Sequence, residues 1–316
     1  MGKVGGERNF GFGKQMAWAG KNALADRYGK GHYGTQAAHS ERWQQFCHYA
    51  HEQGVRDVRQ VTEALVMAYG QSLQQQVIVD AMTVSYAQNL LSSVNVVLAT
   101  MRGDSLLRVS PSVLVGERNN VRQEAPAGMA RAQLQQVVSD LRDRGEARVA
   151  VIAALARDLG LRFREASLLD ARTALQQAER HGAVNITAGT KGGRGHSVDR
   201  WEPVSAEATT TLHRAIELQG KGRNLIPEDR TYTQWRDHAY HVWSGVAQDH
   251  GLRGFHDLRA AYACERYAQL TGYPAPVVAG ERKADKEGDI IARQIISAEL
   301  GHGRTDVTSA YCGSAC

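Results

Sequence analysis

The chain has 316 residues, 42% of them hydrophobic and 22% charged, with a net charge of +5 and a pI ≈ 9.0. This length allows two domains with cores of their own, and the composition has no sign of disorder. The longest apolar run, 149–156, is too short to span a bilayer and the N-terminus lacks a signal-peptide core, so we expect a cytoplasmic protein without a membrane partner.

The first 33 residues are rich in glycine and carry a net charge of +4. No strand pattern precedes the glycines and no Gly-Lys-Ser/Thr follows them, which argues against a nucleotide-binding loop. The segment 1–33 therefore predicts a flexible basic arm whose lysines contact DNA phosphates, with a merely disordered terminus as the alternative. The lysines predicted to make these contacts are Lys14, Lys21 and Lys30.

Residues 34–115 predict a small all-helical domain. Trp43, Phe46, Cys47 and Ala50 repeat with the spacing of one buried helical stripe. Two further stripes follow, at 58–68 and 90–101. A polar stretch with turn residues at 116–128 predicts a linker.

The remaining residues, 129–316, predict helices that flank one small β-hairpin. The strands are expected at 184–188 and 197–204, with Lys191 at the glycine-rich tip between them. The polar segment 272–289 predicts a surface loop. The fold class is thus mainly α with a small β-hairpin.

The four cysteines form no Cys-x-x-Cys pair, which favours a reducing compartment. Cys47, His48 and His51 share one helical stretch but have no second pair of ligands, so we expect no metal.

Several short motifs in the second domain carry residue types suited to phosphoryl transfer. They are Gly160-Leu161-Arg162-Phe163-Arg164-Glu165, Lys191 in the hairpin, His256-Asp257-Leu258-Arg259, Leu300-Gly301-His302, and Tyr311. Each has an ordinary structural reading: the His-x-x-Arg pair as a solvated helix face, for example, or the tyrosine as a core residue. In this order, however, they resemble the tyrosine recombinases, the phage-integrase family.

The resemblance implies a basic arm, a helical SAM-like core-binding domain and an α+β catalytic domain. Tyr311 would be the nucleophile, and Arg162 and Arg259 would hold the phosphate with bidentate guanidinium groups. His256 would accept or donate a proton near the tyrosine, and His302 would donate to a phosphate oxygen. Lys191 would protonate the leaving 5′ hydroxyl. Two neighbouring residues of the hairpin, Arg194 and Arg200, would contact DNA.

The implied function is site-specific recombination that integrates or excises a mobile element through a covalent 3′-phosphotyrosyl intermediate. The implied partners are double-stranded DNA attachment sites, three further copies of the chain in a tetramer on two duplexes, and accessory DNA-bending proteins. No cofactor is implied, and the setting would be the bacterial nucleoid. A type IB topoisomerase-like enzyme that relaxes DNA, and a non-catalytic DNA-binding accessory factor, are the alternatives. Only five residues follow Tyr311, whereas many members of the family end in a helix that docks on a neighbouring protomer.

Overall fold

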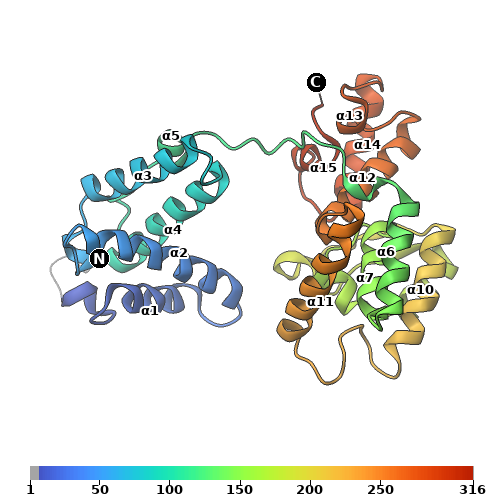
Figure 1. Cartoon of the computed structure of the whole chain (residues 1–316), viewed down its shortest axis with the longest axis horizontal. Coiled ribbons are helices and arrows are strands. Elements are labelled where there is room, and N and C mark those ends of the chain that lie inside the picture. Colours follow the sequence, from blue (N-terminus) through green and yellow to red (C-terminus); the bar gives the residue numbers. More distant parts are fainter. Residues whose placement is uncertain (1–6, 316) are drawn as a thin grey trace. The chain divides into compact units, whose positions relative to one another are not determined.

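The computed structural model describes residues 7–315, apart from the side chain of His196. The chain divides into two compact units, one reaching to Asn119 and the other starting at Asn120. This boundary lies inside the segment predicted as a linker. Figure 1 shows the helices of both units.

Among the described residues of the first unit, the regular secondary structure is all helical. The predicted stripe of Trp43, Phe46, Cys47 and Ala50 lies on one helix and is buried. The helices of this unit are α1 (Met16–Tyr28), α2 (Tyr33–Glu52), α3 (Glu63–Ile78), α4 (Val84–Arg102) and α5 (Pro111–Val115).

The prediction of a flexible arm is wrong for the part of 1–33 that the structure describes. Helix α1 packs on α2 and α4, and Met16, Ala19, Ala23 and Leu24 are part of the unit's core. Gly20 is needed for packing rather than for flexibility, since a Cβ there would lie 2.1 Å from the indole nitrogen of Trp43.

The three lysines predicted to contact DNA are nevertheless exposed, at positions 14, 21 and 30. Lys3 lies outside the described residues. The positive charge is therefore presented by an ordered surface around α1 rather than by a loose tail.

The second unit is built around α7 (Ala147–Asp158), whose side chains are almost all buried. Helices α6, α10 and α12 pack against it. The remaining helices of the unit are α6 (Arg131–Asp143), α8 (Phe163–Leu168), α9 (Ala171–His181), α10 (Ala206–Gln219), α11 (Tyr232–Ala247), α12 (Phe255–Thr271), α13 (Pro276–Ala279), α14 (Lys286–Glu299) and α15 (Ser309–Cys312).

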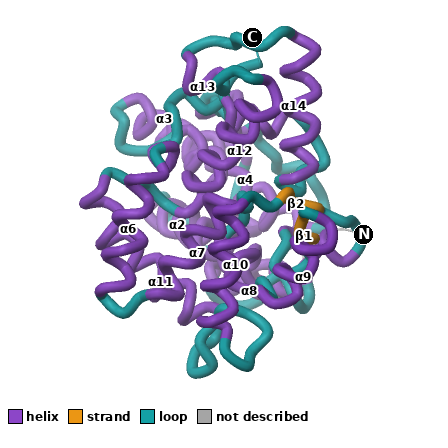
Figure 2. The backbone as a smooth tube through the Cα atoms, turned by 90° about the vertical axis from the view of Figure 1, so that its right-hand side faces the viewer, coloured by secondary structure: helices purple, strands orange, loops and turns teal. Residues whose placement is uncertain are grey.

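The predicted hairpin is present but its strands are short. Strands β1 (Ala183–Asn185) and β2 (Trp201–Pro203) pair antiparallel, with Val184 opposite Glu202. They lie beside α9, as Figure 2 shows in orange. The loop that joins them carries Lys191, at the start of a 3-10 turn, so the lysine is held in a loop between strands as expected.

The predicted surface loop at 272–289 is only partly a loop. It contains α13 and the first turn of α14, and Ala275, Pro276 and Ala284 are buried. Val277 lies so close to Gly313 that a Cβ at that glycine would be 2.8 Å from the Val277 nitrogen. The segment thus supports the chain immediately after Tyr311.

Candidate active site

Tyr311 lies on the short helix α15, with 3% of its surface exposed. Its hydroxyl oxygen is 3.1 Å from Nε2 of His302 and accepts a hydrogen bond of 3.4 Å from Nε of Arg259. The ring of His256 lies beside it, with 5.4 Å between ring centroids. The structure therefore brings together four of the six residues predicted to be catalytic.

The positions of His256 and His302 relative to Tyr311 differ from those expected for their predicted roles. His302, predicted to contact phosphate, is the one within hydrogen-bond distance of the phenol, whereas His256 contacts the ring of Tyr311. Burial, followed by the charges of Arg259, Arg162 and Arg200, lowers the pKa of His302 to about 4. A neutral imidazole at pH 7 has one nitrogen free to accept a proton, so His302 is chemically able to act as the base.

Helix α12 supplies His256 and Arg259 from its first turn and a half, three residues apart and on one face. Arg259 is fully buried. It donates through Nη1 to the carbonyl of Gly160 and through Nη2 to that of Leu300, at 2.6 Å for the latter. Each terminal nitrogen thus has one of its two N–H donors bound to a backbone carbonyl. The bidentate phosphate contact of Arg259 stays a prediction.

Gly160 makes this contact possible. Its φ of +58° is in the left-handed region, and a Cβ would lie 2.5 Å from the ring of Tyr262. Only glycine therefore allows the chain to turn here and present its carbonyl to Arg259. The next turn begins α8, with Arg162 directly before it.

Glu165 is a central residue of the site, and no role is predicted for it in the sequence analysis. It is completely buried, accepts 2.6 and 2.8 Å hydrogen bonds from the side chain and backbone of Arg162, and lies 3.5 Å from Arg259 Nη1. Burial alone would raise the pKa of Glu165, but the charges of Arg200, Arg259 and Arg162 outweigh it and lower the pKa to about 2. The carboxylate therefore stays ionised and holds the arginines in place.

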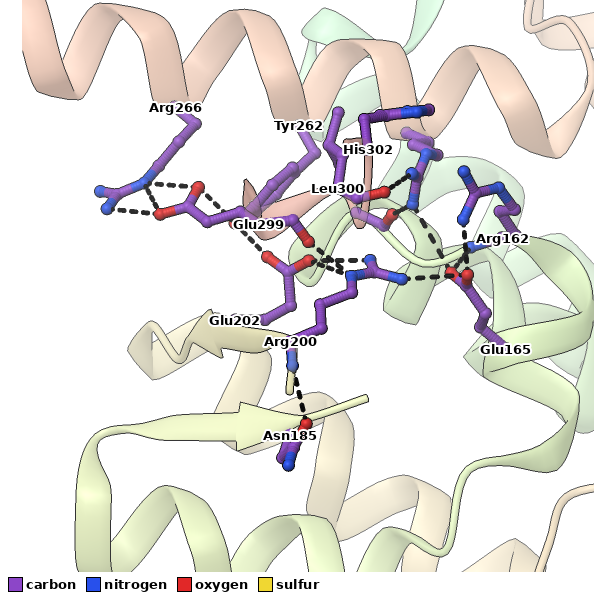
Figure 3. Close-up of polar contacts among 12 residues, drawn as sticks. Arg162, Glu165, Asn185, Arg200, Glu202, Tyr262, Arg266, Glu299, Leu300 and His302 are labelled. Atoms are coloured by element: carbon purple, nitrogen blue, oxygen red, sulfur yellow. Dashed lines mark hydrogen bonds and ion pairs between the residues drawn. The ribbon is translucent and has the colours of Figure 1, made fainter. Parts of the chain in front are cut away.

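Arg200 is not placed as predicted. It was expected to contact DNA from the hairpin, but its side chain is only 4% exposed. Its Nη1 lies 3.0 Å from Glu165, an ion pair without an aligned hydrogen bond, while Nη2 donates to Glu202 at 2.7 Å. Its Nε also donates to the carbonyl of Glu299 at 2.5 Å. Figure 3 shows Arg200 between the two carboxylates, an inward orientation that strand alternation alone does not reveal.

A second buried carboxylate pair extends this network. Tyr262 donates to Glu202 at 3.0 Å and lies 3.4 Å from Glu299, which Arg266 binds through Nε and Nη2 (Figure 3). Burial raises the pKa of Glu202 to about 7, against the opposing charge of Arg200. The network ties strand β2 to α12 and to the end of α14, directly before His302.

Lys191 and Arg194 lie on the loop between the strands and are exposed. They line one pocket with Arg162, Arg200 and His302. This pocket presents three permanently charged guanidinium groups and one ammonium group, which suits an anion such as a phosphodiester. Lys191 and Arg194 both lie on its wall, so the geometry does not choose between them as the proton donor.

Among residues 7–315, no group of three or more histidine, cysteine, aspartate or glutamate side chains is arranged to hold a metal ion. None of the helices described for this chain is long and apolar enough to cross a membrane. The three cysteines within the same part of the chain, Cys47, Cys264 and Cys312, are unpaired and buried.

Part of the chain matches a known family. Residues 116–265, just under half of its length, match the family model described as integrase. The match includes Arg162, Lys191, His256 and Arg259 but ends before His302 and Tyr311, whose place in the site rests on the geometry given above. No curated protein matches the sequence.

Solved structures of integrases have a similar fold. The Tn1549 transposon integrase in complex with transposon right end DNA is 12% identical, with a TM-score of 0.59 and 96% of each chain covered. A λ integrase dimer bound to a COC′ core site is 15% identical, with a TM-score of 0.56 over 92% of this chain and 74% of that one. A λ integrase tetramer bound to a Holliday junction is 14% identical, with a TM-score of 0.55 over 93% and 76%. At these identities the likeness shows the fold, which is mainly helical with a small antiparallel hairpin.

Proposed function

We propose that this chain is a tyrosine recombinase, which cleaves and rejoins DNA strands through a covalent link between Tyr311 and a 3′ phosphate. The observation that carries the proposal is the position of the Tyr311 hydroxyl, within hydrogen-bond distance of His302 and Arg259 at the edge of a cationic cluster. A phenol becomes a strong nucleophile once its proton has an acceptor, and the nearby imidazole is one.

In the cleavage step the phenol oxygen of Tyr311 bonds to phosphorus as the bond from phosphorus to the 5′ oxygen breaks. The phenol proton passes to Nε2 of His302, and Lys191 gives a proton to the departing 5′ oxygen. Rejoining reverses these steps, with a 5′ hydroxyl from the same or a partner strand as nucleophile. The phosphodiester energy is kept in the tyrosyl link, so the cycle needs no nucleotide.

The arginines stabilise the negative charge that develops on the phosphate oxygens. Arg162 and Arg200 both line the pocket and pair with Glu165, and Arg162 is the more exposed of the two, with 25% of its side chain exposed. Arg259 contributes its charge from the buried side and orients the phenol through Nε. His256, whose pKa is lowered first by burial and then by Arg259, would complete the wall beside the tyrosine ring.

The biological reaction we propose is integration or excision of a mobile element at double-stranded DNA attachment sites, by a tetramer on two duplexes with accessory DNA-bending proteins. Its support is the match of residues 116–265 to the integrase family model and the similar fold of proteins described as a transposon integrase on transposon DNA and as a λ integrase tetramer on a Holliday junction.

Strand exchange between two distinguishable duplexes tests this proposal. A recombinase joins a labelled strand of one attachment-site duplex to the other, and the product is longer or shorter than either parent. Relaxation of a supercoiled plasmid without any exchanged product would instead indicate a topoisomerase-like enzyme. Binding without either reaction would indicate an accessory factor.

A further inference from the structure

The segment that leads into the second unit is bound to the helix that carries the nucleophile. The backbone N–H of Arg122 donates a 2.9 Å hydrogen bond to the carbonyl of Ser309. Ser309 is the first residue of α15, and Tyr311 lies two residues further on. A residue just past the boundary between the two units thus contacts the tyrosine segment directly.

The side chain of Arg122 binds the other half of the site. Its Nη2 donates to Asp257, which follows His256 in the first turn of α12, and its Nε donates to the carbonyl of Glu124 at 2.8 Å. The side chains of Arg122 and Asp257 are mostly buried, with 16% and 7% of their surfaces exposed. A charge-assisted bond shielded from water in this way is stronger and better oriented than a surface ion pair.

Asp257 also fixes the rest of this segment. Its second carboxylate oxygen accepts a 2.7 Å hydrogen bond from the backbone N–H of Ala127. Gly128 then lies directly on Leu258, where a Cβ would be 2.7 Å from a leucine methyl group. Residues 122–128 are therefore held along the start of α12. Arg122, at the beginning of this segment, also contacts α15 through Ser309.

We propose that Arg122 is a positioning residue, which fixes α15 against the first turn of α12 and so makes the placement of the Tyr311 hydroxyl depend on the path of the segment 122–128. This inference rests on the proposed function, because it concerns when Tyr311 is correctly placed to react. Arg122 has no part in the chemistry itself: it is bound to Asp257, Glu124 and Ser309 rather than to the phenol.

Arg122→Ala in the full chain should slow covalent capture of DNA about 10- to 100-fold at saturating DNA, the scale expected when a reacting group is misplaced by about 1 Å. The DNA concentration for half-maximal rate should change little. Arg122→Lys keeps the charge and one donor to Asp257, so it should recover part of the rate. Arg253→Ala is the matched control, since Arg253 pairs with Glu124 of the same segment at 2.6 Å but is 62% exposed; it should react at the wild-type rate.

Amide hydrogen exchange gives a readout that is independent of activity. Exchange in residues 309–313 should become faster in Arg122→Ala and stay unchanged in Arg253→Ala, while α7, at the core of the same unit, keeps its protection. Loss of protection in α7 as well would mean that Arg122 supports the whole unit, and would overturn a specific positioning role.

The two proposals fail in different ways. If the wild-type protein captures no DNA, the proposed function is wrong, and the exchange of residues 309–313 still decides the role of Arg122. If wild type captures DNA and Arg122→Ala does so equally fast with unchanged exchange, the positioning role is wrong and the proposed function stands.

Discussion

Replacing Glu202 with glutamine should make the protein more stable at neutral and alkaline pH. Glu202 is fully buried, with one oxygen facing Arg200 and the other facing Tyr262. A protonated Glu202 can donate to Tyr262, which is then free to donate to Glu299. Glutamine offers the same pattern at every pH, because its oxygen accepts from Arg200 and its amide donates to Tyr262.

The size of the effect follows from the pKa of Glu202, which burial raises from 4.5 to about 7. Because this pKa is raised, the folded protein keeps a proton that the unfolded chain has lost. The resulting stabilisation is complete below pH 4.5 and is lost as the pH rises through about 7. At about 1.4 kcal/mol per pKa unit, the wild type should lose on the order of 2–3 kcal/mol relative to Glu202→Gln between pH 5 and pH 8.

Urea unfolding at a series of pH values measures this difference. The fluorescence of Trp235 and Trp243, both buried in the second unit, reports its unfolding. Other titrating groups are common to both proteins, so they cancel when the two free energies of unfolding are subtracted. A difference that stays flat from pH 5 to pH 8, or one that favours the wild type as the pH rises, would refute the reasoning.

Glu265→Gln is the matched control. Burial alone would raise the pKa of Glu265, but its hydrogen bonds and ion pairs with Arg131 and Arg157 outweigh burial and lower it. The stabilisation from the ionised Glu265 is therefore complete above pH 4.5. It is lost only as the pH falls through the lowered pKa of this residue. The free-energy difference between wild type and Glu265→Gln should accordingly be constant from pH 5 to pH 8.

Three further predictions concern DNA. Lys191→Ala should slow cleavage but leave DNA binding nearly normal. A substrate with a bridging sulfur at the 5′ position, whose leaving group needs no proton, should restore the cleavage rate of Lys191→Ala. If this substrate restores the rate of Arg194→Ala instead, Arg194 is the acid. Lys21→Gln and Lys30→Gln should each reduce the log-log salt dependence of duplex binding by about 0.9, and an unchanged slope would remove that lysine as a phosphate contact. Arg162→Lys should slow covalent capture by about two or more orders of magnitude with DNA affinity retained, because the compact ammonium group keeps the charge but lacks the planar fork that can bind phosphate bidentately. Near-normal capture would contradict this role.

The residues around Tyr311 could be predicted from the sequence because their motifs, in this order along the chain, resemble those of the tyrosine recombinases. One helical turn between His256 and Arg259 is enough to place both on one face. The contacts of Arg200 and Glu202 could not be recognised in this way. They depend on which face of a short strand turns inward, and on partners of Arg200 that lie 35 and 99 residues away along the chain, at Glu165 and Glu299.

The error at the N-terminus has a different physical cause. Glycine was interpreted as a sign of flexibility, but Gly20 allows α1 to approach the indole of Trp43 closely. The buried positions Met16, Ala19, Ala23 and Leu24 already follow helical spacing. Two of these four residues are alanines, so the stripe is weak by hydrophobicity alone, and only packing against α2 shows that it is a core surface.

Covalent capture in EDTA tests the central claim most directly. The wild-type protein and Tyr311→Phe are incubated with a nicked attachment-site duplex whose short leaving fragment diffuses away, and denaturing gels reveal any protein bound to DNA. Phenylalanine keeps the buried ring and removes only the attacking oxygen. We predict a denaturant-resistant band from the wild type that EDTA does not abolish, and none from Tyr311→Phe although it still binds DNA. A band that persists in Tyr311→Phe, or a wild-type band that disappears in EDTA, would contradict a tyrosine nucleophile.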